Sequence, residues 1–213
     1  MGIPVLVIGE SGSGKSTSLR NFSPDEIGIF NVASKPLPFR KKLPAINQAT
    51  YSSIAQGLSR GSLRAYAIDD SQYLLAFEFF DKAKETGYGK FTDMALNFKM
   101  LVDFVVKKTP PDCIVYFLHH AETKENGFVK AKTIGKMIDE KLTLEGLFSI
   151  VLYCKADRER HYFVTQSMGE SVAKTPMDMF PLEIDNDLKM VDETIREYYD
   201  LAKKEKENDS ETV

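Results

Sequence analysis

The chain has 213 residues and a formal net charge of −3, with 43% hydrophobic and 28% charged residues. This size and balance favour one α/β domain over residues 1–203, followed by a charged tail over residues 204–213 that we expect to be disordered. The small negative charge argues against a protein that coats nucleic acid through its overall charge. Any contact with nucleic acid is therefore expected at a local basic patch.

Targeting and redox signals predict a cytoplasmic protein. No run of about 18 uncharged apolar residues occurs, and the N-terminus lacks the pattern of a signal peptide, so we expect no membrane partner. Cys113 and Cys154 lie in apolar runs and lack metal-ligand spacing to each other or to the histidines. We expect both to be buried, reduced thiols.

Apolar runs of strand length alternate with helical stretches along the chain. The predicted strands are Ile3–Ile8, Ile27–Val32, Ala65–Ile68, Cys113–Leu118, Phe148–Cys154 and His161–Thr165. The predicted helices are Lys15–Phe22, Tyr51–Leu58, Tyr73–Lys84, Thr92–Lys107 and Asn186–Lys203. This alternation predicts an α/β fold whose central sheet is mostly parallel and carries helices on both faces. Because only residues 155–160 separate the last two strands, we expect an antiparallel hairpin at one edge.

Residues 9–16 read GESGSGKS, which fits the phosphate-loop pattern G-x-x-x-x-G-K-[ST] between a strand and a helix. Glycines let backbone N–H groups turn toward phosphates, and a following helix adds the positive end of its dipole. We expect Lys15 to reach the β- and γ-phosphates, Ser16 to bind Mg²⁺, and Thr17 to contact the α-phosphate. The predicted nucleotide-binding residues are Gly9, Glu10, Ser11, Gly12, Ser13, Gly14, Lys15, Ser16 and Thr17. ATP is the default nucleotide, since the sequence has no guanine-reading N-K-x-D segment.

Acids and histidines follow two later predicted strands. Asp69 is predicted to complete the Mg²⁺ site with Ser16. Asp70 has two possible roles, as the general base that orients the attacking water or as the cap of the next helix. At least one of His119 and His120 should stand at the same rim of the sheet, and each is either a sensor of the γ-phosphate or a structural histidine.

Several blocks in a fixed order resemble a known family. They are GESGSGKST, YAIDDSQYL, the two adjacent histidines, Gly135-Lys136-Met137-Ile138 with Leu142 ahead of FSIVLYC, and Ala173-Lys174-Thr175 ahead of MFPLEIDNDLKMVDETIREYY. Together they resemble the bacteriophage AAA/RecA-type nucleotide-binding proteins, which include RecA-like single-strand annealing proteins of phage recombination modules. The likeness runs from about residue 3 to residue 200. The phosphate loop alone is shared with a vast superfamily, and the order of the later blocks is more specific.

This resemblance implies a RecA-like P-loop NTPase core that hydrolyses ATP and acts on single-stranded DNA in recombination or annealing. It also implies a homo-oligomer that works beside a single-strand-binding protein. In such folds the loop after the fourth strand contacts DNA, and here that loop carries Lys124, Phe128, Lys130, Lys132 and Lys136. Lysines around an aromatic ring can grip a strand through phosphate contact and stacking, although a solvated loop looks the same in sequence. Pro36–Lys42 is a second basic and aromatic cluster, for which DNA binding and a solvated loop are both open interpretations.

The resemblance further implies a cation donated by a neighbouring subunit, at the place of Lys174. Many relatives carry an arginine shortly after this lysine, whereas this chain has Pro176 and Met177. Arg158 and Arg160 are alternative donors.

Two other functions use the same phosphate loop. One is a nucleotide-dependent adaptor with little turnover. The other is a P-loop kinase for a small molecule, which needs an arginine-rich lid, and Asp157–Arg160 is the nearest candidate but is short.

Overall fold

The computed structural model describes residues 1–134 and 143–201 and has an α/β fold built on a nine-stranded, mostly parallel sheet. The strands are β1 Ile3–Gly9, β2 Ile27–Asn31, β3 Ala45–Asn47, β4 Ala65–Asp69, β5 Ile114–Thr123, β6 Val129–Ala131, β7 Ile150–Ala156, β8 His161–Val164 and β9 Glu183–Asp185. The α-helices are α1 Tyr51–Arg60, α2 Gln72–Asp81, α3 Gly89–Lys108 and α5 Leu188–Tyr198, and two short 3₁₀ helices are η1 Ser16–Leu19 and η2 Leu144–Leu147. All six predicted strands and four of the five predicted helices are confirmed, with shifted ends.

The sheet has the order β3-β2-β4-β5-β1-β7-β8-β9, and β6 pairs with β5 outside this path. The strands from β3 to β7 in this order are parallel. Parallel strands between two helical layers read as continuous apolar runs because neither face meets water, and residues 5–8 of β1 are 0% exposed.

The predicted hairpin is present but is not the edge of the sheet. β7 and β8 are antiparallel, as expected. β9 then pairs antiparallel with β8 and occupies the edge position. β9 has only three residues, of which Glu183 and Asp185 are exposed, so no apolar pattern announces it in the sequence.

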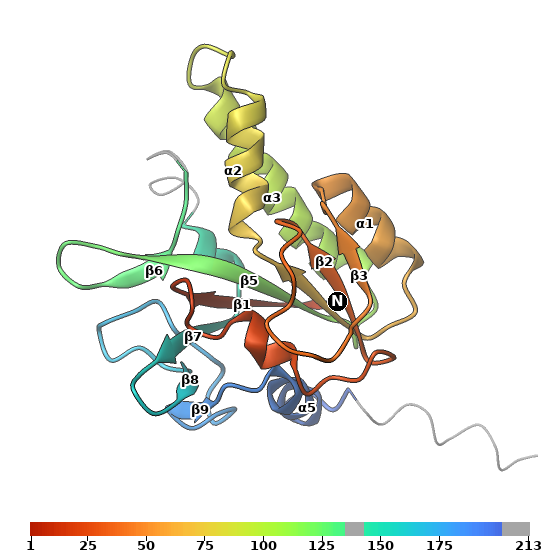
Figure 1. Cartoon of the computed structure of the whole chain (residues 1–213), viewed down its shortest axis with the longest axis vertical. Coiled ribbons are helices and arrows are strands. Elements are labelled where there is room, and N and C mark those ends of the chain that lie inside the picture. Colours follow the sequence, from red (N-terminus) through yellow and green to blue (C-terminus); the bar gives the residue numbers. More distant parts are fainter. Residues whose placement is uncertain (135–142, 202–213) are drawn as a thin grey trace, which may run out of the picture.

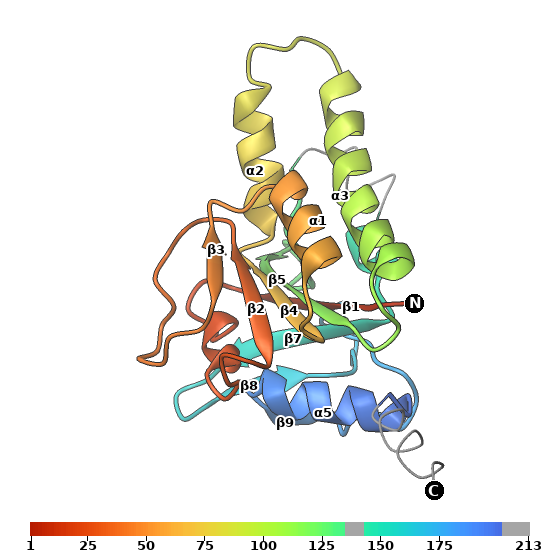
Figure 2. The same cartoon turned by 90° about the vertical axis from the view of Figure 1, so that its right-hand side faces the viewer.

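Helices cover both faces of the sheet, as predicted (Figure 2). α1, α2 and α3 lie on one face and α5 lies on the other. Alternating residues of β5 separate the two cores, with Phe117 packed against the α3 residue Phe98 and Tyr116 facing the other way. Each large apolar side chain buried in this way stabilises the fold by roughly 1.5–3 kcal/mol.

α5 is fixed to the sheet by a buried polar network. The Tyr116 hydroxyl donates to Asp192 Oδ1 at 3.0 Å, and Arg196 Nε donates to Asp192 Oδ2 at 2.6 Å. The Arg196 guanidinium also donates to the carbonyl oxygens of Asp112 and Arg64, at 2.8 Å each. The buried Asp192 carboxylate is therefore fully paired between the sheet and the helix.

The predicted helix Lys15–Phe22 is wrong in extent, because only η1 forms there. The Ser18 hydroxyl donates to the carbonyl oxygen of Lys15 at 2.5 Å, which competes with helical backbone pairing. Pro24 follows soon after and stops further propagation. A four-residue helix has little macrodipole, so the helix-dipole contribution expected next to this loop is small.

α2 and α3 form an antiparallel helical arm that projects away from the sheet (Figures 1 and 2). Phe77, Phe80 and Tyr88 of this arm are 45%, 69% and 78% exposed. Among the described residues, no helix has the length and apolar character needed to cross a membrane. The tail over residues 204–213 and the block at residues 135–138 with Leu142 lie outside the described residues.

Candidate functional site

The predicted phosphate loop leaves the carboxyl end of β1 and turns sharply before η1. Its backbone closes through a hydrogen bond from Ser13 N–H to the carbonyl oxygen of Glu10, at 3.2 Å. Gly14 has φ +102°, and a Cβ there would stand 2.9 Å from Nδ1 of His161. Both the left-handed backbone and the close ring therefore require glycine at this position.

The β7–β8 hairpin contacts this loop through side-chain hydrogen bonds, which the sequence patterns did not predict. His161 Nδ1–H donates to the carbonyl oxygen of Ser13 at 2.8 Å, and the Cys154 thiol donates to the same oxygen at 3.1 Å. Burial raises the pKa of Cys154 to about 11, so the side chain stays a protonated donor. Both cysteines are buried and free, as predicted.

The Lys15 side chain folds back onto the phosphate loop. Its ammonium donates to the carbonyl oxygens of Gly9 and Glu10 at 2.8 Å each, and the residue is only 7% exposed. Burial lowers the pKa of Lys15 below its ordinary value. In the described part of the chain the hydrogen-bond acceptors of this ammonium are neutral carbonyl oxygens, so a bound anion would stabilise it.

Ser16 and Asp69 meet across the sheet although 53 positions separate them. The Ser16 hydroxyl donates to Asp69 Oδ1 at 2.7 Å. Burial raises the pKa of Asp69, which ends β4 and is 5% exposed, so a bound cation would offset the cost of its buried charge. In the described part of the chain no three His, Cys, Asp or Glu side chains form a ready metal cluster. Mg²⁺ at this pair would take its other ligands from phosphate oxygens and water.

Asp70 directly follows β4 and does not cap α2. Ser71 holds the N-cap position of that helix, while Asp70 has φ +59° and turns its carboxylate toward the loop. Lys35 Nζ donates to Asp70 Oδ2 at 2.8 Å, and His120 Nε2 lies 3.2 Å from Asp70 Oδ1. Burial raises the pKa of Asp70, but these two partners outweigh it and leave the pKa below its ordinary value. The geometry thus favours the predicted role at the site over the helix cap.

The two histidines have different surroundings, and both belong to β5 itself. His119 is 0% exposed, with Nε2–H donating to the carbonyl oxygen of Lys132 at 2.8 Å and Nδ1 accepting from the Ser71 hydroxyl at 2.9 Å. Burial lowers the pKa of His119 to about 4, so the ring is neutral. His119 therefore has the surroundings of a structural histidine, and His120 remains the candidate sensor beside Asp70.

These groups surround a cavity of about 230 Å³ at the carboxyl ends of the parallel strands. Its lining residues are Ser11, Gly12, Gly14, Lys15, Ser16, Thr17, Lys35, Pro36, Pro38, Asp69, Asp70 and His120. A second cavity of about 210 Å³ lies on the other side of the loop, between residues 10–13 and residues 153–156 of β7. The loop is therefore open on both sides.

Of the predicted DNA-contacting residues that the structure describes, Lys124, Phe128 and Lys130 lie on the β5–β6 hairpin and Lys132 directly follows it; the hairpin extends beyond the sheet (Figure 1). Lys124 and Lys132 are exposed, and the Lys124 ammonium lies 5.9 Å from the centre of the half-buried Phe128 ring. Lys130 instead pairs with Glu122 at 3.0 Å with its side chain 12% exposed. Lys136 lies outside the described residues.

The candidate trans-acting cations lie apart from the cavity. Lys174 is exposed, and its backbone pairs with Val151 of β7 through hydrogen bonds of 2.8 and 2.9 Å. Arg158 is exposed in the hairpin turn, and Arg160 pairs with Glu183 at 2.5 Å. None of the three is among the described residues that line the cavity. A role for any of them in a neighbouring subunit stays a prediction.

No protein-family model matches the chain, and no curated protein matches its sequence. The family resemblance therefore stays a prediction. The proposals below are drawn from the geometry of the chain's own residues.

Proposed function

We propose that this chain binds a nucleoside triphosphate with Mg²⁺, ATP by default, in a RecA-like P-loop core and hydrolyses its terminal phosphate bond. The observation that carries the proposal is the 2.7 Å contact between Ser16 and Asp69 at the mouth of the glycine loop. Two residues so distant in sequence meet at the point where a P-loop serine and a strand-end aspartate share Mg²⁺.

The order of the strands supports this proposal. β5 lies between β1, which leads into the loop, and β4, which ends at Asp69 and is followed by Asp70. The loop, Asp69 and His120 consequently converge at one rim, where ligands bind in open α/β sheets. This arrangement is expected of a RecA-like core.

Each step of phosphoryl transfer can be assigned to one or more of the described residues. Lys15 neutralises charge on the β- and γ-phosphates, and Ser16 and Asp69 hold Mg²⁺, which would draw electron density from the phosphate oxygens. Asp70 accepts a proton from the water whose oxygen forms the new bond to the γ-phosphorus, while the bond to the β-phosphate oxygen breaks. His120 keeps the Asp70 carboxylate aimed at this water.

ATP hydrolysis by the purified chain, with Lys15→Ala as the blank and Lys108→Ala as the matched control, tests this proposal. We expect Lys15→Ala to lower turnover by roughly 100-fold or more, because it removes a charge that acts in the transition state. Lys108 is an exposed lysine at the end of α3 and does not line the cavity in the described part of the chain. Equal turnover in all three proteins would reject the proposal.

Action on single-stranded DNA, as a homo-oligomer beside a single-strand-binding protein, is the extended form of the proposal. The exposed lysines Lys124 and Lys132 beside Phe128 on a projecting hairpin support it. We expect Lys124→Ala and Phe128→Ala to weaken binding of a labelled oligonucleotide, and DNA to stimulate turnover. Unchanged binding and turnover would remove DNA from the proposal and leave the ATPase intact.

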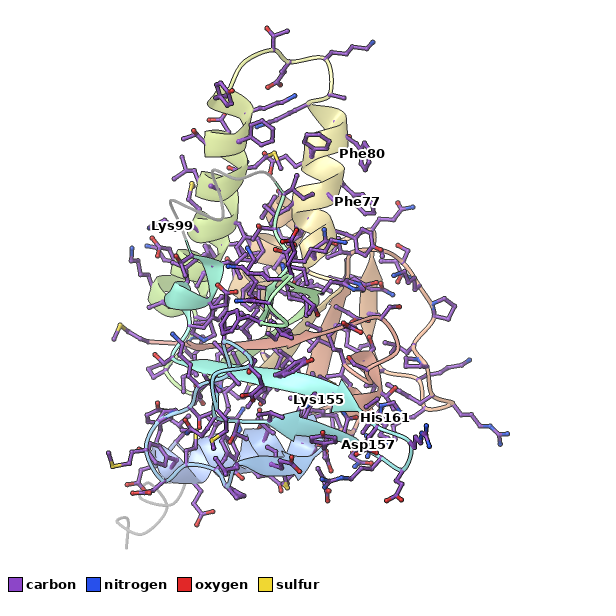
Figure 3. All side chains as sticks on the ribbon, turned by 90° about the vertical axis from the view of Figure 1, so that its left-hand side faces the viewer. Phe77, Phe80, Lys99, Lys155, Asp157 and His161 are labelled. Atoms are coloured by element: carbon purple, nitrogen blue, oxygen red, sulfur yellow. The ribbon has the colours of Figure 1, made fainter. Side chains whose placement is uncertain are left out.

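A nucleotide-dependent adaptor is the second candidate, favoured by the aromatic side chains on the helical arm. Phe77 and Phe80 project from α2 into solvent, away from the sheet (Figure 3). Exposed aromatic rings of this size are typical of protein contacts. Tight nucleotide binding with negligible turnover would favour this function over hydrolysis.

The kinase alternative finds less support. Its candidate lid, Asp157–Arg160, is the tight turn between β7 and β8, and Arg160 is engaged by Glu183. A turn fixed in this way is short for closing over a donor nucleotide.

A further inference from the structure

Lys35 lies at the rim of the phosphate cavity although the loop motif does not include it. The residue follows β2, and its ammonium lies 2.8 Å from Asp70 Oδ2 and 4.7 Å from the centre of the Tyr73 ring. Its side chain is 55% exposed and lines the same cavity as Lys15. A second lysine therefore faces the place where the terminal phosphate would lie.

The fold builds this position with several contacts. Asn31, which lies opposite Asp69 in the sheet, donates from Nδ2 to the carbonyl oxygen of Lys35 at 2.7 Å. Ser34 has φ +56°, and its hydroxyl accepts from Gln48 N–H at 2.7 Å. Pro36 restricts the backbone of Lys35 from the other side. The chain is thus turned and anchored so that the lysine side chain leaves toward the cavity.

The negative charges in the cavity indicate a role for the Lys35 ammonium. Asp69 and Asp70 place two carboxylates beside the loop, and a terminal phosphate that entered next to Asp70 would meet a like charge. The lysines among the described lining residues are Lys15 and Lys35. Lys15 leaves the loop near the β-phosphate position, whereas Lys35 already stands on the Asp70 side. Its long flexible stem lets the ammonium move by a few ångströms without a change in the backbone.

We propose that Lys35 is a ligand of the terminal phosphate of the bound nucleoside triphosphate. When the triphosphate binds, the Lys35 ammonium exchanges Asp70 Oδ2 for phosphate oxygens. Asp70 then keeps its contact with His120 and has one carboxylate oxygen open to water. This inference rests on the proposed function, since it assigns a residue to the same nucleotide site. It makes the contact of Lys35 specific for a triphosphate, because a diphosphate lacks the group that draws the ammonium away.

The test compares binding of ADP and of a non-hydrolysable ATP analogue, each with Mg²⁺, by calorimetry. We expect Lys35→Ala to lower the affinity for the ATP analogue by roughly 10- to 100-fold, which is the range of one charged hydrogen bond. The affinity for ADP should fall by less than about 2-fold. Lys35→Arg should keep most of the affinity for the ATP analogue, and Lys108→Ala, at the exposed end of α3, should change the affinity for neither nucleotide. ADP binding also shows that each variant is folded.

A second background separates direct contact from an effect through Asp70. The Asp70→Asn variant lacks the ion pair with Lys35. If Lys35 binds phosphate directly, adding Lys35→Ala to this variant should still lower the affinity for the ATP analogue by roughly 10- to 100-fold. If Lys35→Ala has no effect in that background, or weakens both nucleotides equally in the parent chain, the proposal is overturned and Lys35 acts only by positioning Asp70. If the parent chain binds neither nucleotide, the proposed function itself fails.

Discussion

The contact between Gly14 and His161 makes a quantitative prediction about the phosphate loop. Gly14→Ala and Gly12→Ala both place a Cβ on a left-handed backbone, at φ +102° and φ +81°. That conformation costs an alanine about 1–2 kcal/mol. At Gly12 a Cβ meets nothing within 4 Å, whereas at Gly14 it stands 2.9 Å from His161 Nδ1. Gly14→Ala must therefore also displace the ring.

Displacing the ring breaks the 2.8 Å hydrogen bond from His161 to the carbonyl oxygen of Ser13, which contributes about 1 kcal/mol. We expect Gly14→Ala to lower the free energy of unfolding by about 2–3 kcal/mol and Gly12→Ala by about 1–2 kcal/mol. Urea unfolding of both variants gives these values directly.

A double-mutant cycle with His161→Ala tests the cause of the difference. Without the ring, Gly14→Ala should cost about 1 kcal/mol less, and the remaining close neighbour of the added Cβ is Asn186 Nδ2 at 3.3 Å. The cost should then approach that of Gly12→Ala. Equal losses in the free energy of unfolding for the two glycine variants in the parent chain, or a coupling energy near zero, would refute the reasoning. The contact between the hairpin and the loop would then contribute nothing measurable to stability.

Three further predictions follow from the described contacts. Asp192→Ala should lower the free energy of unfolding by about 3 kcal/mol, because it leaves the buried Tyr116 hydroxyl without its acceptor and removes the carboxylate that pairs with Arg196. Glu193→Ala on the exposed side of α5 should change it by less than about 0.5 kcal/mol, and urea unfolding measures both. Because the pKa of His119 is lowered to about 4 in the folded chain, its contribution to stability is complete above its unfolded pKa of about 6.5 and is lost as the pH falls from there toward 4. Stability should therefore drop by up to about 2 kcal/mol between about pH 7 and pH 5, and His119→Asn should flatten this part of the profile; an unchanged slope would contradict the assignment. Cys154, with its pKa raised to about 11 by burial, should react with a thiol reagent only when the protein unfolds, so modification at neutral pH in the folded state would contradict its place under the loop.

The strands were predictable because burial leaves a simple pattern. β1, β4 and most of β5 are buried on both faces and therefore read as unbroken apolar runs. β3 is exposed at all three residues and gives no such pattern. The helix expected after the phosphate loop failed for a local reason, since the Ser18 hydroxyl takes the Lys15 carbonyl that helix propagation would use.

The site divides along a similar line. Lys15, Ser16 and Asp69 could be named from the sequence because the spacing of a loop motif and the end of an apolar strand fix their places. Lys35 and His161 could not, since each reaches the loop only through the order of the strands. Ser34-Lys35-Pro36 reads in sequence as an ordinary surface turn. Contacts that depend on which strands become neighbours leave no local mark in the chain.

In this structure the groups that would meet a nucleotide are engaged with one another. Lys15 donates to two loop carbonyls, Ser16 to Asp69, and Lys35 to Asp70. In the proposed function, nucleotide affinity would be a difference between new contacts and these internal ones. A diphosphate without metal would displace only the Lys15 contacts, and Mg²⁺ would also separate Ser16 from Asp69. A triphosphate would in addition draw the Lys35 ammonium from Asp70. This side-chain exchange would therefore be the step that distinguishes a triphosphate from a diphosphate.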